Sequence, residues 1–492
     1  MNGRVSDPPG QRPTLLASGA LSVDIDTALL RTDPVYERLF YLCRARPSVI
    51  VPLVLALFKG RQSFRDALVQ ETGPDFRISS FPRQTEVEDL VGAARRDGKP
   101  VEWQSREDVD LATEDPGFQQ IFEGPSELMR VKDSEARAEE LRSRYPEGFA
   151  HVGRRASDMP LWRAAKERYA VNLRSSVRRQ AEREGLCLVE LARRKPLLPS
   201  LLRAMRPHQW LKNLLVFVPL GLDLGHLGAH DVAVALLAFV CLCLLTSGTY
   251  VINDLFDVDA DRRHPRKRNR PIASGDVTIP VAAVASLALI LLALGTALAI
   301  GANFAAALVT YLMLTLAYSI KLKRMAMVDV LVIAMLFTLR ILAGMLIENN
   351  SPSHWLLLFS IFFFLSLAFM KREVEFNVMH RVGRDQLSGR GYAMDDRMYV
   401  LSCGLSSGMA AIVIFSLFVS ETLTILPGNY GAPLLLWGVM ALLGYWILRM
   451  WLLTTRGLMN DDPILFAARD RTSLLLGAGC ALLILGAQVL HF

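Results

Sequence analysis

The apolar positions of this chain follow two patterns that divide it near residue 206. After that point the sequence consists of long apolar runs separated by short polar loops, whereas the preceding part has only short apolar pieces. Most of the long runs are about 20 residues, the length at which a helix crosses a bilayer. We therefore predict an all-α polytopic membrane bundle of nine transmembrane helices within residues 206–492. The nine runs are 214–229, 231–252, 278–299, 303–320, 326–347, 354–371, 400–421, 433–453 and 472–491.

The first part of the chain alternates short apolar pieces with helical patterns. Leu21, Val23 and Ile25 predict a first strand, and helical patterns follow at Ser134–Arg144 and Pro160–Glu167. Because strands that alternate with helices favour a parallel sheet, we expect residues 15–180 to form a soluble α/β domain. Further strands are expected at Val101–Trp103, Phe149–Val152 and Tyr169–Val171.

Two segments flank this domain. Residues 1–14 are polar and rich in Pro and Gly, which predicts disorder. Residues 181–205 carry many basic side chains together with Pro196 and Pro199, so we expect a connector that lies on the membrane surface. Its apolar residues, which can dip into the interface, are Leu197, Leu198, Leu201 and Leu202.

The distribution of Lys and Arg predicts the topology. The formal net charge is +7, but the basic residues lie mostly in the N-terminal part and in loops, which favours a membrane surface over nucleic acid as the partner. The loops at 222–231, 299–303, 347–354 and 421–433 contain no Lys or Arg, whereas the alternate loops do. This asymmetry predicts a multi-pass inner-membrane protein with a cytoplasmic N-terminal domain.

Neither the N-terminus nor the cysteines indicate secretion. Residues 1–24 lack the charged and apolar regions of a signal peptide. The six cysteines are scattered without metal-ligand spacing, so we expect reduced, structural thiols. The sequence leaves homo-oligomerisation open.

A row of acidic residues follows the second apolar run. On a helix Asp254, Asp257 and Asp261 share one face, with Asn253 on its flank. Carboxylates that gather in this way repel unless a cation joins them, and oxygen ligands at a membrane edge suit Mg²⁺, which commonly shares its coordination with substrate phosphates. A solvated acidic helix end, balanced by the arginines that follow, is the alternative. The cytoplasmic position favours a Mg²⁺–diphosphate site.

The row and its surroundings resemble the first signature of the UbiA-type prenyltransferase superfamily. The matching residues are the row itself and the Arg-Pro-Ile-Ala-Ser-Gly stretch at 270–275, and the resemblance covers about residues 203–492. It implies that Asn253, Asp254, Asp257 and Asp261 bind Mg²⁺ and a diphosphate. The second signature is present as Tyr318 and a basic loop followed by Asp329.

The second signature departs from the family pattern. Ile333 stands at its second acidic position, so a second Mg²⁺ would lose a ligand. Arg340, a charge within an apolar run, is a candidate partner for a phosphate or carboxylate because buried charges normally face the bundle interior.

Three further stretches resemble the decaprenyl-phosphate phosphoribosyltransferase subgroup. They are Arg206–Asn213, Lys371–Glu375 with Gly389–Tyr392, and Asp461–Ala467 with Arg469–Arg471. This resemblance implies that a soluble donor, 5-phosphoribosyl 1-diphosphate, reacts with a polyprenyl phosphate in the bilayer. The candidate catalytic residues are Asp254, Asp257, Asp261 and Asp329; the candidate substrate-binding residues are Asn253, Lys212, Lys321, Lys371, Arg340 and Tyr318.

Other readings are open at this stage. Basic residues at a membrane edge are often only topological anchors. A UbiA-type enzyme could instead prenylate an aromatic acceptor in quinone or haem synthesis, although Ile333 disfavours that reading. A non-enzymatic transporter is compatible with Arg340, but carboxylates at one membrane edge, rather than at mid-membrane, argue against it.

The N-terminal part resembles the haloacid dehalogenase-like phosphatase fold. The matching residues are Val23–Asp33, which contain a D-x-D motif, and Gly153–Trp162. The resemblance implies that Asp24 is a nucleophile, that Asp26 is its acid/base, and that Asp158 belongs to the acidic motif.

This N-terminal motif is degenerate. Thr27 and Ala28 replace the usual Gly-Thr pair, while Arg154 and Arg155 replace polar and acidic members. We expect such a guanidinium to repel Mg²⁺ and to pair with Asp24. Ser105 and Arg137 stand only roughly where the Ser/Thr and Lys motifs should be. A non-catalytic structural or regulatory domain and a residual phosphatase are the two competing interpretations.

Overall fold

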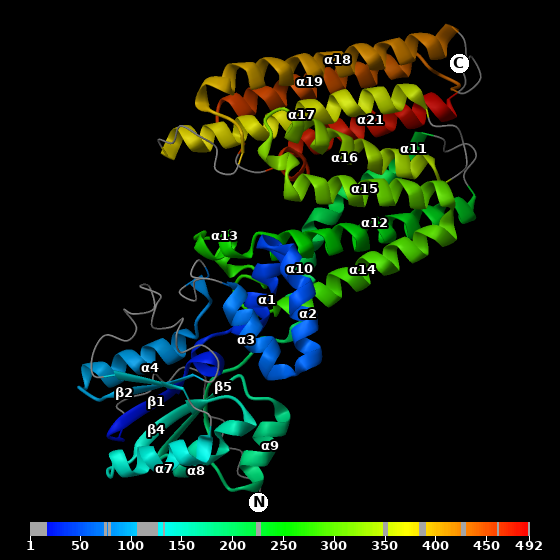
Figure 1. The fold of residues 1–492 in the computed structure, drawn as a ribbon. Coiled ribbons are helices and arrows are strands. Elements are labelled where there is room, and N and C mark those ends of the chain that lie inside the picture. Colours follow the sequence, from blue (N-terminus) through cyan, green and yellow to red (C-terminus); the bar gives the residue numbers. More distant parts are fainter. Residues whose placement is uncertain are drawn as a thin grey trace, which may run out of the picture. The chain divides into compact units, whose positions relative to one another are not determined.

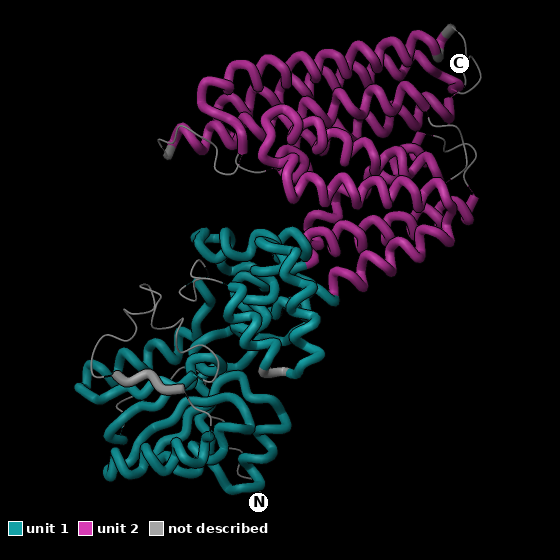
Figure 2. Tube along the Cα trace, in the orientation of Figure 1, with its two compact units in different colours: residues 1–204, 251–284 teal, residues 205–250, 285–492 magenta. Residues whose placement is uncertain are grey.

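The computed structural model groups the chain into two compact units (Figure 2). It describes residues 17–72, 76, 80–105, 126–130, 133–222, 228–347, 353–382, 390–424, 430–459 and 462–490. The first unit consists of residues 1–204 and 251–284, and the second of residues 205–250 and 285–492. The acidic row and the loop that follows it therefore belong to the first unit, with the N-terminal domain. The disorder predicted for residues 1–14 lies outside the described residues.

The first unit contains a six-stranded parallel sheet with the strand order β3-β2-β1-β4-β5-β6. The predicted parallel sheet is thus confirmed, although the sequence patterns missed its two edge strands, β3 and β6. The strands are β1 (Ala20–Asp24), β2 (Val101–Ser105), β3 (Ser126–Arg130), β4 (Phe149–Gly153), β5 (Glu167–Val171) and β6 (Val189–Ala192).

Helices cover both faces of the sheet (Figure 1). Leu21 and Val23 of β1 pack against α4, whereas Ala20 packs against α7 and α8. This alternation follows from the two-residue period of a strand. The helices of this unit are α1 (Pro34–Ala45), α2 (Ile50–Lys59), α3 (Arg61–Thr72), α4 (Thr85–Arg96), α7 (Ser134–Arg144), α8 (Met159–Ala164), α9 (Ser175–Arg183), α10 (Leu197–Met205) and α13 (Val258–Arg263).

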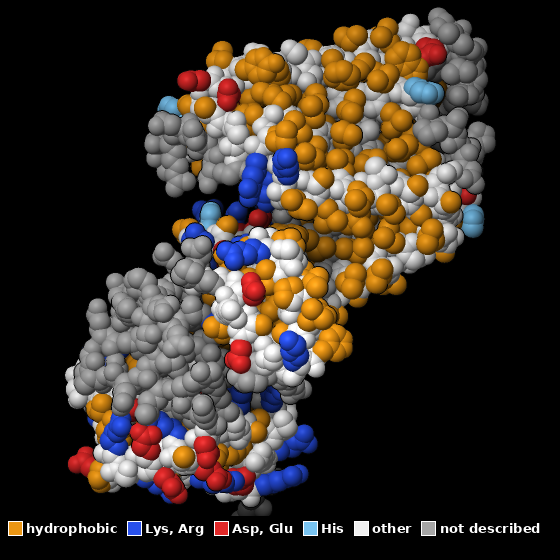
Figure 3. Space-filling view, viewed as in Figure 1, with side chains coloured by type: hydrophobic (Ala, Val, Ile, Leu, Met, Phe, Trp, Pro, Cys, Tyr) orange, Lys and Arg blue, Asp and Glu red, His pale blue; other side chains and the backbone are white. Residues whose placement is uncertain are grey.

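Among the described residues, eight helices are long and apolar enough to cross a membrane. Each corresponds to one of the predicted runs. They are α12 (Ala229–Phe256), α14 (Ile279–Ile300), α15 (Ala302–Ile320), α16 (Val328–Met345), α17 (His354–Val382), α18 (Arg397–Thr424), α19 (Leu435–Thr455) and α21 (Arg471–Val489). Hydrophobic side chains cover the visible surface of the bundle (Figure 3), as expected for contact with lipid.

The first predicted span is not among these eight helices. Its described residues 214–222 lie in the end of a 3₁₀-helix, Pro207–Phe217, and in the short α11, Val218–Leu222. The segment runs alongside α16 in the same direction, because Asn213 contacts Arg340 and Val216 lies against Gly344 farther along both segments. A Cβ on Gly344 would come within 2.2 Å of the Val216 carbonyl oxygen. Only glycine therefore permits this approach.

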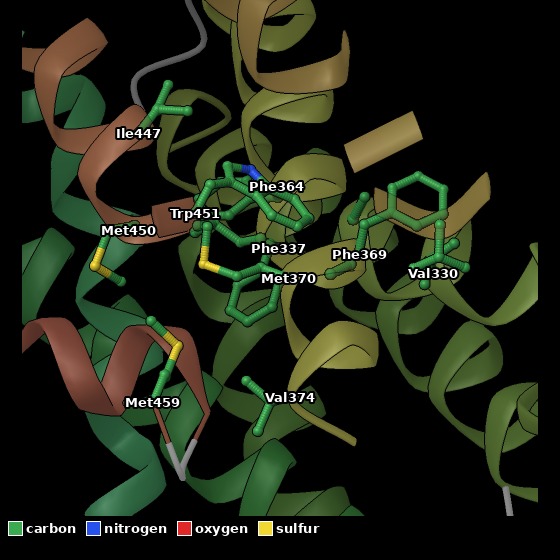
Figure 4. Packing of buried hydrophobic residues seen from close by; sticks show 14 of the residues in the cluster. Val330, Phe337, Phe364, Phe369, Met370, Val374, Ile447, Met450, Trp451 and Met459 are labelled. Carbon is green, nitrogen blue, oxygen red and sulfur yellow. The ribbon is translucent and has the colours of Figure 1, made fainter. Parts of the chain in front are cut away.

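The core of the second unit is rich in aromatic residues and methionine (Figure 4). Phe337 of α16 stacks on Phe364 of α17, with 4.9 Å between the ring centroids. Trp451 of α19 is 2% exposed and donates a hydrogen bond from Nε1 to Ser366 of α17. These contacts join α16, α17 and α19 into one packed layer of helices. Several of the polar residues described below belong to α16 and α17.

Candidate functional site

The acidic row lies where α12 ends and α13 begins. The chain turns at Asp257, which is the N-cap of α13. The amides of Asp257 and Asp261 nevertheless donate to the carbonyls four residues earlier, at 2.9 and 2.8 Å. Helical periodicity thus continues through the break, and this keeps Asp254 and Asp261 on one face.

One arginine holds two of the row's carboxylates. Arg270 Nη1 lies 3.1 Å from Asp254 Oδ1 and 2.5 Å from Asp261 Oδ2. Both aspartate side chains are 2% exposed, whereas Arg270 is 28% exposed. Lys267 is 4.0 Å from the other oxygen of Asp261. The two buried carboxylates therefore converge on a single point that solvent can reach.

The donor set at this point suits Mg²⁺. Among the described residues, no group of three His, Cys, Asp or Glu side chains gathers closely enough to hold a metal ion. The structure thus unites Asp254 and Asp261 but does not bring Asp257 into the same group, and Asn253 has no side-chain hydrogen bond to the row. Two carboxylates and remaining positions for phosphate oxygens or water are a common arrangement for Mg²⁺ in proteins.

The loop that carries the row is braced by the N-terminal domain within the same unit. Arg262, next to Asp261, forms two hydrogen bonds to Glu37 of α1, at 2.5 and 3.1 Å, and both side chains are at most 5% exposed. Arg44 of α1 donates to the Phe256 carbonyl at 2.7 Å and to Asp259 at 2.6 Å. Helix α1 therefore contacts the loop on both sides of Asp257.

A second set of contacts fixes the far end of this loop. Asp276 is fully buried and accepts hydrogen bonds from Arg31 at 2.5 Å and Lys195 at 2.9 Å. Gly275 has a φ of +75°, and a Cβ there would lie 3.0 Å from the Arg31 Cβ. A cavity of about 490 Å³ remains between α1 and α13, and Phe40 of α1 packs beside it against Leu255 and Val258, so both ion pairs and apolar packing form this contact.

In the second unit, two lysines share one carboxylate. Lys212 and Lys371 lie 2.8 and 3.5 Å from Asp462 Oδ2. Asp462 is also the N-cap of α20 (Pro463–Ala467). Burial would raise the pKa of Asp462, but the two lysines outweigh burial and lower it to about 2. The cluster therefore brings two basic side chains to one ionised carboxylate.

Asp329 lies in a separate network. Its side chain is fully buried and accepts a hydrogen bond from Tyr392 at 2.6 Å and from Arg390 at 3.3 Å. Arg372 is 3.5 Å away, and its Nη2 has no hydrogen-bond partner among the described residues. Arg390 also donates to the hydroxyl of Tyr318 at 3.2 Å. The second signature thus joins a carboxylate to arginines.

The structure separates the two remaining predicted cations from these clusters. Arg340 donates to Asn213, Tyr311 and the Leu336 carbonyl, at 2.6 to 3.0 Å. No carboxylate among the described residues lies within ion-pair distance of it, so neutral groups satisfy this buried charge. Lys321 is exposed at the end of α15 and pairs with none of the described residues.

The sequence profile of the UbiA prenyltransferase family matches residues 214–469, just over half of the chain. This chain belongs to the UbiA prenyltransferase family. The match includes both signatures and the stretch that contains Asp462. The acidic row, the lysine pair and the Asp329 network are therefore parts of a UbiA-family protein.

Two relatives differ in how much of the UbiA-family chain they cover. An uncharacterized protein, y4nM, from Sinorhizobium fredii is 36% identical over 93% of this chain and 89% of its own length. A decaprenyl-phosphate phosphoribosyltransferase from Mycolicibacterium smegmatis is 38% identical over 38% of this chain and 61% of its own length. The similarity to the Mycolicibacterium smegmatis enzyme thus concerns the C-terminal part of this chain.

A solved UbiA homologue also resembles this chain. The structure from Archaeoglobus fulgidus, bound to GPP and Mg²⁺, covers 58% of this chain and 99% of its own, with 19% identity and a TM-score of 0.45.

The N-terminal part of this UbiA-family chain carries a second acidic group. Asp24 is the last residue of β1 and Asp26 follows it, while Asp158 follows β4, the adjacent strand. Ser105, at the end of β2, donates to Asp26 at 2.9 Å. Burial, together with the charges of Asp158 and Asp26, raises the pKa of Asp24 to about 8. Without a cation, Asp24 is therefore largely protonated at neutral pH.

The expected pairing of an arginine with Asp24 is wrong. Arg155 instead pairs with Asp33 at 3.4 Å, and the backbone amides of Arg154 and Arg155 donate to Asp158. Both amides bind Asp158, and neither guanidinium group forms an ion pair with Asp24 among the described residues. Arg137 does not join this acidic group either, because it is paired with Glu102 at 2.9 Å.

Sequence reasoning missed several residues that complete these clusters. Arg270, Asp462 and Arg390 all lie in stretches that carried the family resemblance, but no spacing rule linked them to their partners. Glu37 and Asp276 had no sequence signal, because each contacts a residue more than 200 positions away.

Proposed function

We propose that this protein transfers 5-phosphoribose from 5-phosphoribosyl 1-diphosphate to a polyprenyl phosphate in the membrane, in a Mg²⁺-dependent reaction. The relatives named decaprenyl-phosphate phosphoribosyltransferase support this donor and acceptor. The observation that carries the proposal is that one chain holds both an acid-rich cluster at Arg270 and a lysine-rich cluster at Asp462. Such a reaction needs a cation site for a diphosphate and an anion site for a phosphate ester.

The acid-rich cluster has the donor role in this proposal. Asp254 and Asp261, with Asp257 as a further ligand, would hold Mg²⁺, which neutralises the negative charge of the departing diphosphate. Arg270 keeps the two carboxylates together when no substrate is bound, and its partial exposure lets it turn toward a phosphate oxygen. Asn253 supplies a neutral amide beside the same group.

The lysine-rich cluster has the phosphate-binding role. Lys212 and Lys371 offer ammonium groups held near each other by Asp462, and this preorganisation lowers the entropy cost of binding a phosphate. Asp329 orients Arg390 and Tyr392, so it acts here as a positioning residue rather than as a metal ligand. Lys321 contributes only to the basic charge of its loop.

The chemistry requires little beyond these two sites. The bond between the ribose C1 and the diphosphate oxygen breaks, and a lipid phosphate oxygen forms the new bond to C1. The products are diphosphate and a polyprenyl phosphoribose that keeps its 5-phosphate. Because the attacking phosphate is already ionised, no general base is needed, and catalysis depends on positioning and charge stabilisation.

We also propose that the acidic row and the N-terminal domain face the cytoplasm, where the soluble donor is present. This topology needs a ninth crossing at residues 207–222. A 3₁₀-helix rises about 2.0 Å per residue and an α-helix about 1.5 Å. The 11 residues of Pro207–Phe217 and the 5 of α11 thus extend about 30 Å, close to the hydrocarbon thickness. Residues 207–217 run parallel to α16, which agrees with a crossing from the cytoplasmic side to the opposite side.

For the N-terminal domain, we propose a haloacid dehalogenase-like fold whose main role is structural. The strand order around β1 and the acidic residues at the carboxyl ends of β1 and β4 support the fold assignment. The contacts of Glu37 and Arg44 with the loop support the role. Residual phosphatase activity on the 5-phosphate of the product is the second candidate, favoured by Ser105 beside Asp26.

A transfer assay tests the proposed reaction. The purified chain in bilayer discs is given labelled 5-phosphoribosyl 1-diphosphate, Mg²⁺ and decaprenyl phosphate, and lipid-soluble label is counted. We expect product that disappears with chelator and with Asp254→Asn combined with Asp257→Asn. Asp231→Asn, at the opposite end of α12, is the matched control and retains activity. No lipid product from the intact chain, while a prenyl diphosphate and a hydroxybenzoate yield one, would select the aromatic-acceptor alternative.

A separate assay tests the N-terminal domain. The full chain is given its own labelled lipid product, and release of phosphate is followed. The structural role predicts no release above that of Asp24→Asn. Release that depends on Asp24 would establish the phosphatase instead.

A further inference from the structure

Helix α2 of the first unit exposes an apolar face that no described residue covers. The helix is short, Ile50–Lys59, and only Leu53 and Ala56 are buried in it. Phe58 is 85% exposed and Val51 is 65% exposed. The large apolar residues exposed on α2 are Ile50, Val51, Val54, Leu55, Leu57 and Phe58. Six such side chains on ten residues exceed what an ordinary water-facing helix presents.

The two sides of α2 have distinct partners. Leu53 and the preceding Val49 pack with Leu42 of α1 and Leu68 of α3. Val51, Leu55 and Phe58 recur at helical spacing on the opposite side. The inward side of α2 packs in the core of the unit. The outward side, with Val51, Leu55 and Phe58, does not take part in that core and can contact another apolar medium. Figure 3 shows hydrophobic side chains at the surface where Figure 1 draws α2.

The charged residues that flank α2 in the sequence, within residues 38–65, are all of one sign. From Arg38 to Arg65 the sequence contains no Asp or Glu, and Arg46 and Lys59 are exposed at the two ends of the apolar segment. Basic side chains beside an apolar helix face favour an anionic bilayer surface. A second copy would bring the same positive charges against these, which disfavours self-association.

The unit that contains α2 is also tied to the membrane. It includes the last turns of α12 and the first turns of α14, two of the membrane-spanning helices. Val284, in that part of α14, is 70% exposed, and Leu198 of α10 is 68% exposed. The apolar segment Pro47–Lys59 would extend only about 20 Å as a helix, which is too short to cross a bilayer.

We propose that α2 is an interfacial membrane helix, inserted by its Val51–Phe58 face into the cytoplasmic leaflet. It would lie in the plane of the interface, with its apolar side chains buried about 5–10 Å below the headgroups. Because α1 and α2 share a core, this anchor also holds Glu37 and Arg44 of α1, which contact the loop of the acidic row. The choice of leaflet rests on the topology proposed above, but the proposal does not depend on the identity of the substrates.

Spin labelling of the full chain in bilayer discs tests this. In a background in which the exposed Cys43 and Cys187 are serine, cysteine is introduced in place of Phe58, Val51 or, as the control on α7, the exposed Glu139. The discs contain phosphatidylcholine and phosphatidylglycerol. Collision of each label with dissolved oxygen, which concentrates in lipid, is compared with collision with a water-soluble nickel chelate.

We expect the oxygen-to-nickel ratio to be several-fold higher at positions 58 and 51 than at 139. A ratio at position 58 equal to that at 139 places the face in water and overturns the proposal. Labels that are immobile and shielded from both reagents place the face against protein, from a second copy or from another part of the chain, and also overturn it. All three positions are on the surface, so the substitutions leave the core of the unit intact.

Discussion

Two charge clusters in this protein are opposite in composition. In the first unit, Asp254 and Asp261 share the guanidinium of Arg270; in the second, Lys212 and Lys371 share the carboxylate of Asp462. In each, a single minority charge holds together two like charges that would otherwise repel. The majority charge then determines the ligand. The acid-rich cluster has the sign for a divalent cation, and the lysine-rich cluster has the sign for a phosphate.

The Asp329 network differs from both clusters because its acidic and basic side chains are equal in number. Two acids, Asp329 and Glu375, face two arginines, Arg372 and Arg390. Such a network has no excess charge to offer a ligand, although Nη2 of Arg372, which has no hydrogen-bond partner among the described residues, still provides a donor. We therefore expect substitutions to reduce transfer activity to different degrees, with the largest loss at the acid-rich cluster.

The largest effect is expected from Asp254→Asn. The substitution halves the charge of the pair that converges on Arg270, and loss of one charged group at an electrostatic site typically costs about 100- to 1,000-fold in rate. Transfer rates at several Mg²⁺ concentrations should show both a lower maximum and weaker Mg²⁺ dependence. If the variant matches the wild-type Mg²⁺ titration, as we expect of Asp231→Asn, the acid-rich cluster is not the cation site.

The lysine-rich cluster should give the next largest effect. We expect Lys371→Met to lower kcat/KM by about 10- to 100-fold, the equivalent of about 1.4 to 2.7 kcal/mol, through a higher KM for one phosphorylated substrate. The Mg²⁺ titration should not change. Lys321→Met is the matched control, since that lysine is exposed and unpaired among the described residues. Equal losses in both variants would indicate a general effect of positive charge.

The sequence predicted the helices better than the clusters. The apolar runs located eight membrane helices because length and hydrophobicity are local properties. The run 214–229 was expected as one ordinary helix, but its described residues 214–222 belong to the end of a 3₁₀-helix and to the short α11. Proline lacks an amide hydrogen and restricts the backbone, and the close approach of Val216 to Gly344 is a long-range contact that the run itself does not encode.

The clusters depended on contacts that spacing does not encode. The row of three aspartates indicated a metal site, yet which two converge was decided by Arg270, on the loop beyond α13. Asp462 and Lys212 are 250 residues apart. The expectation for Arg154 and Arg155 failed for a related reason, because local backbone hydrogen bonds to Asp158 outweighed a long-range charge argument.

Glu37→Ala tests whether the acid-rich cluster is held from outside. The Glu37–Arg262 pair is buried, and removal of one partner from such a pair costs about 3–5 kcal/mol of stability. We expect faster hydrogen exchange in residues 257–276 and about a 10-fold loss of activity, mostly through weaker Mg²⁺ dependence. Exchange in β4, which does not contact Arg262, is the internal reference.

The exchanged pair, Glu37→Arg with Arg262→Glu, separates bracing from a general loss of folding. It should recover part of both the protection and the activity. If Glu37→Ala loosens β4 as much as the loop, or if exchange at the loop does not change, then α1 does not brace the acidic row.

The smallest effect is expected from Asp462→Asn, and its pH dependence is informative. Loss of the minority charge makes the lysine-rich cluster more positive, so phosphate attraction rises while the spacing of the lysines loosens. These opposing changes should leave KM within about 5-fold of the wild-type value, roughly 1 kcal/mol. Because Lys212 and Lys371 lower the pKa of Asp462 to about 2, the carboxylate is ionised throughout the usable range.

The ratio of variant to wild-type KM should therefore be the same at pH 6 and pH 8. The stability that this carboxylate contributes is fully present above about pH 4 and is lost only as the pH falls toward 2. A ratio that changes between pH 6 and pH 8 would mean that a group of the cluster, Asp462 or one of the two lysines, changes its protonation there. The lysine-rich cluster would then not consist of two cationic side chains around an ionised carboxylate. Its contrast with the acid-rich cluster would not hold.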